Sequence, residues 1–78
     1  MKAREWNRVI LTVDVPSEFR DAIIPKGTTG VVIEAYKQPI EGYAVDVSTP
    51  DESSLSGFQY DSLILYPDQF DVVPTDST

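Results

Sequence analysis

The side chains of this sequence that could do acid–base chemistry are carboxylates, with Asp46, Asp61 and Asp68 as the candidates. The chain has no histidine and no cysteine, so it lacks a side chain that normally titrates near neutral pH and a thiol nucleophile. Paired carboxylates alone can act as acid and base, as they do in glycoside hydrolysis. Each of the three candidates, however, stands where an outward strand position or a turn ordinarily carries an acid. The sequence therefore predicts a protein that is not an enzyme.

Two further patterns could hold a ligand. The run Asp51-Glu52-Ser53-Ser54 gathers oxygen ligands, yet it lacks the spaced acids and central glycine of an EF-hand loop and is typical of a solvated hairpin tip. The pair Gly27-x-x-Gly30 precedes a strand instead of a helix and has no following Lys-Ser/Thr, so it indicates a tight turn and not a phosphate cradle. We expect no metal site and no cofactor.

The charge of the chain is unevenly distributed. Its net charge is −7, and residues 38–78 carry eight acidic residues and no basic one. Binding to phosphate backbones depends on Lys and Arg, so nucleic acid and anionic membranes are disfavoured as partners. The acidic half favours a protein partner with a basic surface, although the same acidity would also serve solubility alone.

Alternating apolar residues and turn residues predict the elements that position these groups. Ser17 to Ile23 could form one helical turn capped by Ser17, Ile33 is expected to point inward in its strand, and a bulge is expected near Gly30. Pro67-Asp68-Gln69 predicts a 3-10 turn that returns Phe70 to the core. The expected strands cover residues 8–15, 31–36, 43–47, 58–66 and 71–73.

Five strands with these connections fit a small, closed SH3-like barrel, because closure removes the exposed edges of a lone sheet. The predicted class is therefore all-β, with one domain over residues 1–74 and a flexible tail at 75–78. Residues 1–6 lack the apolar core of a signal peptide, and no stretch of the chain approaches membrane-spanning length. We expect a cytoplasmic protein.

Aromatic residues provide the best candidates for a binding surface. Trp and Tyr are enriched at interface hot spots, and Trp6, Tyr36, Tyr60 and Tyr66 are expected at element ends or outward positions. The alternative is that Tyr43, Tyr60, Phe58 and Phe70 fill the core. The candidate protein-binding surface comprises Phe19, Tyr36, Tyr66, Asp51, Glu52 and Asp68.

Four segments, at 9–15, 25–34, 43–47 and 63–70, resemble the short bacterial family catalogued as domain of unknown function 4926. Its members show a glycine pair leading into an apolar strand, a second apolar strand, and a leucine pair running into a turn, here Leu63, Leu65 and Pro67-Asp68-Gln69. The resemblance implies a small SH3-like barrel without an established activity. Some members look like neighbours of toxin-type genes, which would suit an accessory or neutralising (antitoxin- or immunity-like) partner.

Residues 26–36 also resemble the KOW element of ribosome- and polymerase-associated barrels. This alternative implies a nucleic-acid or ribosome-associated module. It requires the basic residues to share one face. These are Arg4, Arg8, Arg20, Lys26 and Lys37.

Overall fold

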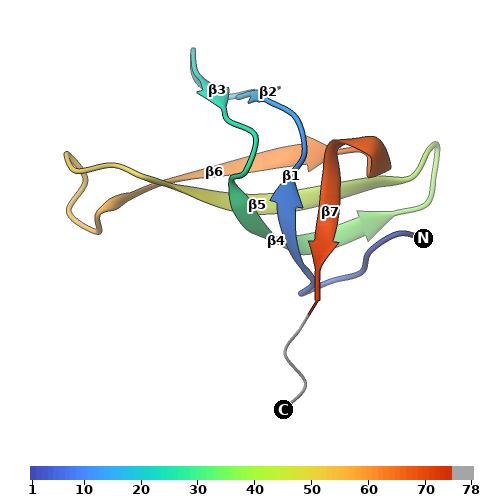
Figure 1. Cartoon of the computed structure of the whole chain (residues 1–78). Helices are drawn as coiled ribbons and strands as arrows, with labels where there is room; N and C mark the ends of the chain where they lie inside the picture. Colours follow the sequence, from blue (N-terminus) through green and yellow to red (C-terminus); the bar gives the residue numbers. More distant parts are fainter. Residues whose placement is uncertain (75–78) are drawn as a thin grey trace.

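Short alternating apolar segments give an almost entirely β structure in the computed structural model, which describes residues 1–74 (Figure 1). The tail expected at 75–78 lies outside the described residues. One 3-10 helix, η1 (Pro67–Gln69), precedes the last strand, as predicted. The strands are β1 (Arg8–Leu11), β2 (Val15–Pro16), β3 (Ile23–Ile24), β4 (Thr29–Tyr36), β5 (Gly42–Pro50), β6 (Phe58–Leu65) and β7 (Phe70–Val73).

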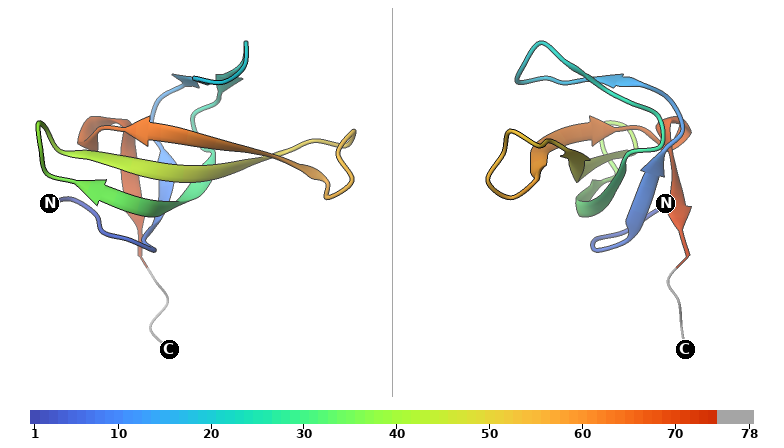
Figure 2. Two further views of the ribbon diagram at one scale, coloured as in Figure 1. Left: turned by 180° about the vertical axis from the view of Figure 1, so that it is seen from behind. Right: turned by 60° about the vertical axis from the view of Figure 1, so that its left-hand side comes forward.

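Five of these strands form one antiparallel sheet in the order β6-β5-β4-β1-β7. Figures 1 and 2 show β1 and β7 running crosswise to β5 and β6, so the sheet coils around its own core. The predicted all-β class, the five strands and the 3-10 turn before the last strand are confirmed. β2 and β3 form a separate two-stranded hairpin that stands beside this sheet.

The expected closure of the sheet is wrong. β6 and β7 form its two edges, and no strand pairing joins them within residues 1–74. The chain leaves β6 at Pro67, whose nitrogen cannot donate to a ladder, and η1 carries it to β7 on the far side of β1. Side chains span the core instead, because Tyr43 of β5 packs edge-on against Phe70 of β7 with ring centroids 5.3 Å apart.

The core is built from the inward side chains of all five main strands and of the hairpin. Tyr43, Val45 and Val47 alternate inward along β5, as the sequence predicts, and all three are buried. Burial of large apolar side chains is the main stabilising contribution in a domain of this size. The buried cluster is Ala3, Val9, Leu11, Val15, Ile24, Val32, Tyr43, Val45, Val47, Leu63, Leu65 and Phe70.

The segment from Ser17 to Ile23 was expected to form one helical turn, but it is not helical. Ser17 N–H donates to the carbonyl of Ala22 at 2.9 Å, and the Ser17 hydroxyl accepts a hydrogen bond from Phe19 N–H at 3.3 Å. Both contacts close a turn between β2 and β3. A helical turn this short has too few hydrogen bonds to offset its nucleation cost.

Two strand assignments also differ from the prediction. The expected strand at 8–15 is interrupted after Leu11, which leaves Val13 exposed. In β4 the pairing register shifts between Val32 and Glu34, so the expected bulge exists but lies beyond Gly30. The shift buries Val32 and leaves Ile33 exposed, so the inward placement of Ile33 is wrong.

None of the helical segments within residues 1–74 has the length and apolarity needed to cross a membrane.

Candidate functional site

The outer face of β4, β5 and β6 is the most distinctive surface of the described residues. Because side chains alternate along a strand, burial of Tyr43, Val45 and Val47 turns the even-numbered residues of β5 to this face. These residues are short, and larger side chains flank them on both neighbouring strands. The paired register places Ala44 between Glu34 and Ile64, and Ser48 beside Tyr60.

At one end of this face, two tyrosines flank a glycine. Tyr36 of β4 pairs with Gly42 of β5, and a methyl group placed on Gly42 would lie 3.6 Å from the ring of Tyr66. The glycine therefore lies beside both tyrosines without adding a side chain of its own. The hydroxyl of Tyr36 donates to Glu34 at 2.9 Å, and this bond raises the pKa of the Tyr36 phenol.

Large apolar side chains remain exposed along the whole outer face. Phe58 and Tyr60 stack loosely, with ring centroids 6.3 Å apart, on the side of β6 that faces away from the core. Exposed apolar side chains gathered on one face often mark interaction sites. Its exposed members are Trp6, Ile33, Tyr36, Phe58, Tyr60, Ile64 and Tyr66.

A groove of about 490 Å³ crosses the middle of this face. Trp6, Ile33 and Tyr60 line it with their large side chains, and Arg8 of β1 and Asp46 of β5 line it with charged groups. Gly30 also lines the groove, and a side chain at this position would collide with the carbonyl oxygen of Asp46 at 2.5 Å. The groove thus offers aromatic walls with one basic and one acidic group.

Trp6 is held in an unusual conformation. Its φ of 72° falls in the left-handed region, which bulky residues rarely adopt, and its side chain is 70% exposed. Two hydrogen bonds fix the turn around it: Trp6 N–H donates to the Val32 carbonyl at 2.7 Å, and Arg4 N–H donates to Asn7 Oδ1 at 2.9 Å. Backbone strain of this kind is concentrated at functional sites.

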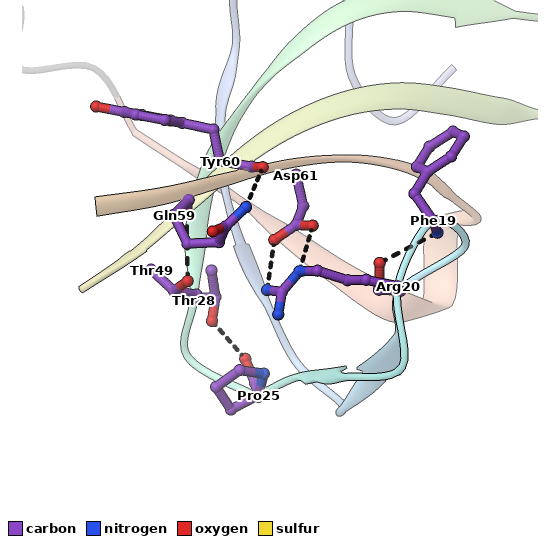
Figure 3. Close-up of polar contacts among 9 residues, drawn as sticks. Phe19, Arg20, Pro25, Thr28, Thr49, Gln59, Tyr60 and Asp61 are labelled. Atoms are coloured by element: carbon purple, nitrogen blue, oxygen red, sulfur yellow. Dashed lines mark hydrogen bonds and ion pairs between the residues drawn. The ribbon is translucent and has the colours of Figure 1, made fainter. Parts of the chain in front are cut away.

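The hairpin of β2 and β3 is tied to β6 by an ion pair (Figure 3). Arg20 donates from Nε and Nη2 to the two carboxylate oxygens of Asp61, at 3.0 and 2.9 Å. These bonds hold the pKa of Asp61 below its ordinary value, against the effect of burial, and raise the pKa of Arg20. Asp61 was expected at an outward strand position or in a turn. It lies instead on the core side of β6, opposite to Tyr60.

A second hollow, of about 650 Å³, lies between this hairpin and the ends of β5 and β6. Ile23, Lys26 and Phe58 are among its lining residues. Phe19 does not line it and projects from the hairpin with 77% of its surface exposed.

The six residues predicted as a binding surface do not form one site. Tyr36 and Tyr66 both lie beside Gly42, at one end of the outer face. Asp51 lies at the opposite end, in the β5–β6 turn, where the hydroxyl and N–H of Ser53 donate to it and lower its pKa. The rest are exposed in three places, with Glu52 in the β5–β6 turn, Asp68 in η1 and Phe19 on the hairpin.

Sequence reasoning omitted Ile33, Phe58 and Ile64 from the surface, and it placed Trp6 and Tyr60 outward without including them in the predicted binding surface. The sequence did carry a signal for this part of the surface. Phe58, Tyr60 and Ile64 alternate with Leu63 and Leu65, and one of two apolar rows on a strand must face away from a single core. No comparable signal exists for Ile33, which depends on the bulge.

The candidate acids are separated in space. Asp46 lies on the outer face and accepts a hydrogen bond from the Ser62 hydroxyl at 2.8 Å, whereas Asp61 lies on the inner face and Asp68 in η1. These positions do not give the paired carboxylates that acid–base catalysis requires. Within residues 1–74, no three acidic residues are grouped as ligands of a metal ion.

Comparisons with family models, with curated proteins and with solved structures return no match for this chain.

Proposed function

We propose that this domain is a non-catalytic protein-binding module that uses the outer face of β4, β5 and β6. The observation that carries the proposal is the row of exposed aromatic and aliphatic side chains around the Trp6–Tyr60 groove. Trp and Tyr contribute large contact areas at interface hot spots, and exposing them without a partner is unfavourable. A strained, exposed tryptophan at the groove wall supports the same reading.

The partner that fits this face is a protein with a basic surface. Glu34 and Asp46 lie on the face itself, and the chain from residue 38 onward contributes no basic residue. Charge complementarity steers association and weakens as salt is added. An accessory or neutralising role toward a basic, toxin-like protein is consistent with the resemblance to the bacterial family. A cytoplasmic location belongs to the same proposal and is tested by cell fractionation.

The KOW-like alternative rests on Arg8, which lines the groove beside Trp6 and Tyr60, because aromatic rings and arginine together can stack on bases. Two features weigh against it. Arg20 is engaged with Asp61, and the overall charge of −7 repels a phosphate backbone.

The test is affinity capture of the tagged protein from its native host at low and high salt, with mass spectrometry and nucleic-acid staining of the bound material. We expect one basic protein in stoichiometric amount, released by salt. The double variant Trp6→Ser/Tyr60→Ser should lose it, whereas the matched control Leu55→Ser, on the fully exposed loop, should retain it. Bound nucleic acid would favour the alternative, and capture that is unaffected by the double variant would contradict the proposed face.

A further inference from the structure

β6 is an edge strand whose outward-facing backbone groups can be identified. Asp51 N–H donates to the Gly57 carbonyl at 2.8 Å, and the same register continues through Thr49 and Gln59 to Tyr43 and Leu65. In an antiparallel ladder, every second pair exchanges both hydrogen bonds. The even-numbered residues of β6, namely Phe58, Tyr60, Ser62 and Ile64, therefore direct their N–H and C=O groups away from β5.

Side chains cap this edge at both ends but not in the middle. The Ser56 hydroxyl bonds to both backbone groups of Phe58, at 3.3 and 3.2 Å. The Gln59 amide donates to the Tyr60 carbonyl at 3.2 Å, and Tyr66 N–H donates to Gln69 Oε1 at 2.8 Å.

Between these caps, no group of the described chain bonds to the Tyr60 N–H or to the outward backbone groups of Ser62 and Ile64. An unpaired backbone edge of this kind is a template for a further strand.

Several usual protections of an edge strand are absent from the middle of β6, and its one inward-pointing charge, Asp61, is paired with Arg20. The sequence Tyr60-Asp61-Ser62-Leu63-Ile64 contains neither proline nor lysine, and the β5–β6 pairing has no bulge. The hairpin of β2 and β3 approaches β6 through the Arg20–Asp61 ion pair and forms no backbone hydrogen bond with it in the described residues.

We propose that the β6 edge binds an extended segment of the basic partner as an additional strand. This inference rests on the proposed protein-binding function and adds the mode of recognition. Main-chain hydrogen bonds to Tyr60, Ser62 and Ile64 provide affinity, and alternate side chains of the added strand provide specificity. A second copy of this chain fits less well, because each copy carries a net charge of −7.

The side chains of β6 define the sequence that this segment should carry. The residues of the added segment that lie beside Tyr60 and Ile64 should be apolar, because they extend the apolar rows of the outer face. The residue beside Ser62 lies two strand spacings, about 10 Å, from Asp46, and the short serine leaves the path open. A lysine or arginine there can reach the Asp46 carboxylate, so the pattern is apolar, basic, apolar at alternate positions.

The test uses blocked peptides of about nine residues, the length of a typical strand, with alternating valine and threonine and either lysine or glutamate at the centre. Titrated into ¹⁵N-labelled protein, the lysine peptide should shift the amide signals of Tyr60, Ser62 and Ile64 and slow their hydrogen exchange. Ser62→Pro removes an outward N–H together with the hydroxyl that donates to Asp46, and it should weaken binding by about tenfold or more. Ser62→Ala keeps the N–H and should leave binding nearly unchanged, with thermal unfolding confirming that both variants are folded.

The edge proposal would be overturned by equal binding of the two peptides, by absence of binding, or by amide shifts confined to β7. It would also be overturned if the protein formed concentration-dependent dimers that protect the β6 amides. The affinity capture separates the two levels of the argument. If Ser62→Pro retains the basic partner, the binding function stands and the edge proposal is wrong. If the unmodified protein retains no protein partner, the proposed function itself fails.

Discussion

Arg20 and Asp61 lie 41 residues apart in the sequence, yet two parallel hydrogen bonds join them across the space between the hairpin and β6. The Asp61 side chain is almost fully buried, whereas that of Arg20 is 41% exposed. Bidentate pairs of this geometry are among the stronger charge-assisted contacts in proteins. The pair therefore adds a polar tie to a hairpin that also packs on the core through Val15 and Ile24.

Replacing Arg20 with methionine should lower stability at pH 7, because it leaves the Asp61 carboxylate buried without its partner. Arg20 holds the pKa of Asp61 below its ordinary value of 3.8 in the folded state. A depressed pKa stabilises the fold above the unfolded-state value, and this contribution disappears as the pH falls through the folded-state value.

The stability difference between the native protein and Arg20→Met should therefore be largest near neutral pH and shrink below about pH 4. Urea unfolding at several pH values measures it. Arg8→Met, at an exposed arginine, is the control and should show no such pH dependence. A difference that stays constant down to pH 2 would show that the ion pair is not its source.

Gly30→Ala should be more destabilising than Gly27→Ala. A methyl group at position 30 would meet the Asp46 carbonyl oxygen at 2.5 Å and Val47 Cγ1 at 2.8 Å, so the β4–β5 pairing must shift. We expect a cost of about 3 kcal/mol. At position 27 the methyl group meets no atom, and only the φ of +91° opposes it, at about 1–2 kcal/mol. Thermal unfolding of both variants ranks them, and the reverse order would contradict the packing argument.

Trp6→Gly should be more stable than Trp6→Ala, by about 1–2 kcal/mol, because only glycine adopts the φ of 72° without strain. Both variants should weaken binding of the captured partner equally, since both remove the exposed ring. Chemical denaturation and a binding titration give the two quantities. An alanine variant as stable as the glycine variant would show that the strain at Trp6 is negligible.

Tyr43→Phe should destabilise the protein by about 1 kcal/mol. The buried Tyr43 hydroxyl accepts a hydrogen bond from Ala3 N–H at 3.2 Å and donates to Glu41, which also accepts from the N–H of Lys2. Loss of the hydroxyl should accelerate hydrogen exchange at the Ala3 amide. Tyr36→Phe is the matched control, because its hydroxyl bonds to Glu34 at the surface. Equal effects of the two variants would mean that burial of the Tyr43 hydroxyl is unimportant.

Local patterns in the sequence were sufficient for the elements that depend on neighbouring residues. Alternation along residues 43–47 predicted the inward row of β5, and Pro67-Asp68-Gln69 predicted η1 and the return of Phe70 to the core. The features that could not be predicted depend on distant residues or on register. The bulge after Val32 reverses the expected orientation of Ile33, and the inward carboxylate of Asp61 is paired by Arg20 from another element.

The candidate surface was predicted only in part, for a related reason. Tyr36 and Tyr66 were chosen as exposed aromatics, but their proximity follows from the register of Gly42 between β4 and β6. In the β5–β6 turn, Glu52 is exposed, as loop composition suggests, and Asp51 is half-buried, yet both lie at the far end of the same face. Composition identifies residues suited to a surface, whereas strand pairing decides which of them are neighbours.

The position of β1 between β4 and β7 has a consequence for how the protein forms in the cell. β7 follows every other element in the chain, and it pairs with a strand that lies near the opposite terminus. During translation, β4, β5 and β6 can pair as soon as they emerge, but Phe70 reaches the core only after β7 has left the ribosome exit tunnel. Until then the nascent chain lacks one side of its core, so apolar side chains that the folded domain buries stay exposed to water.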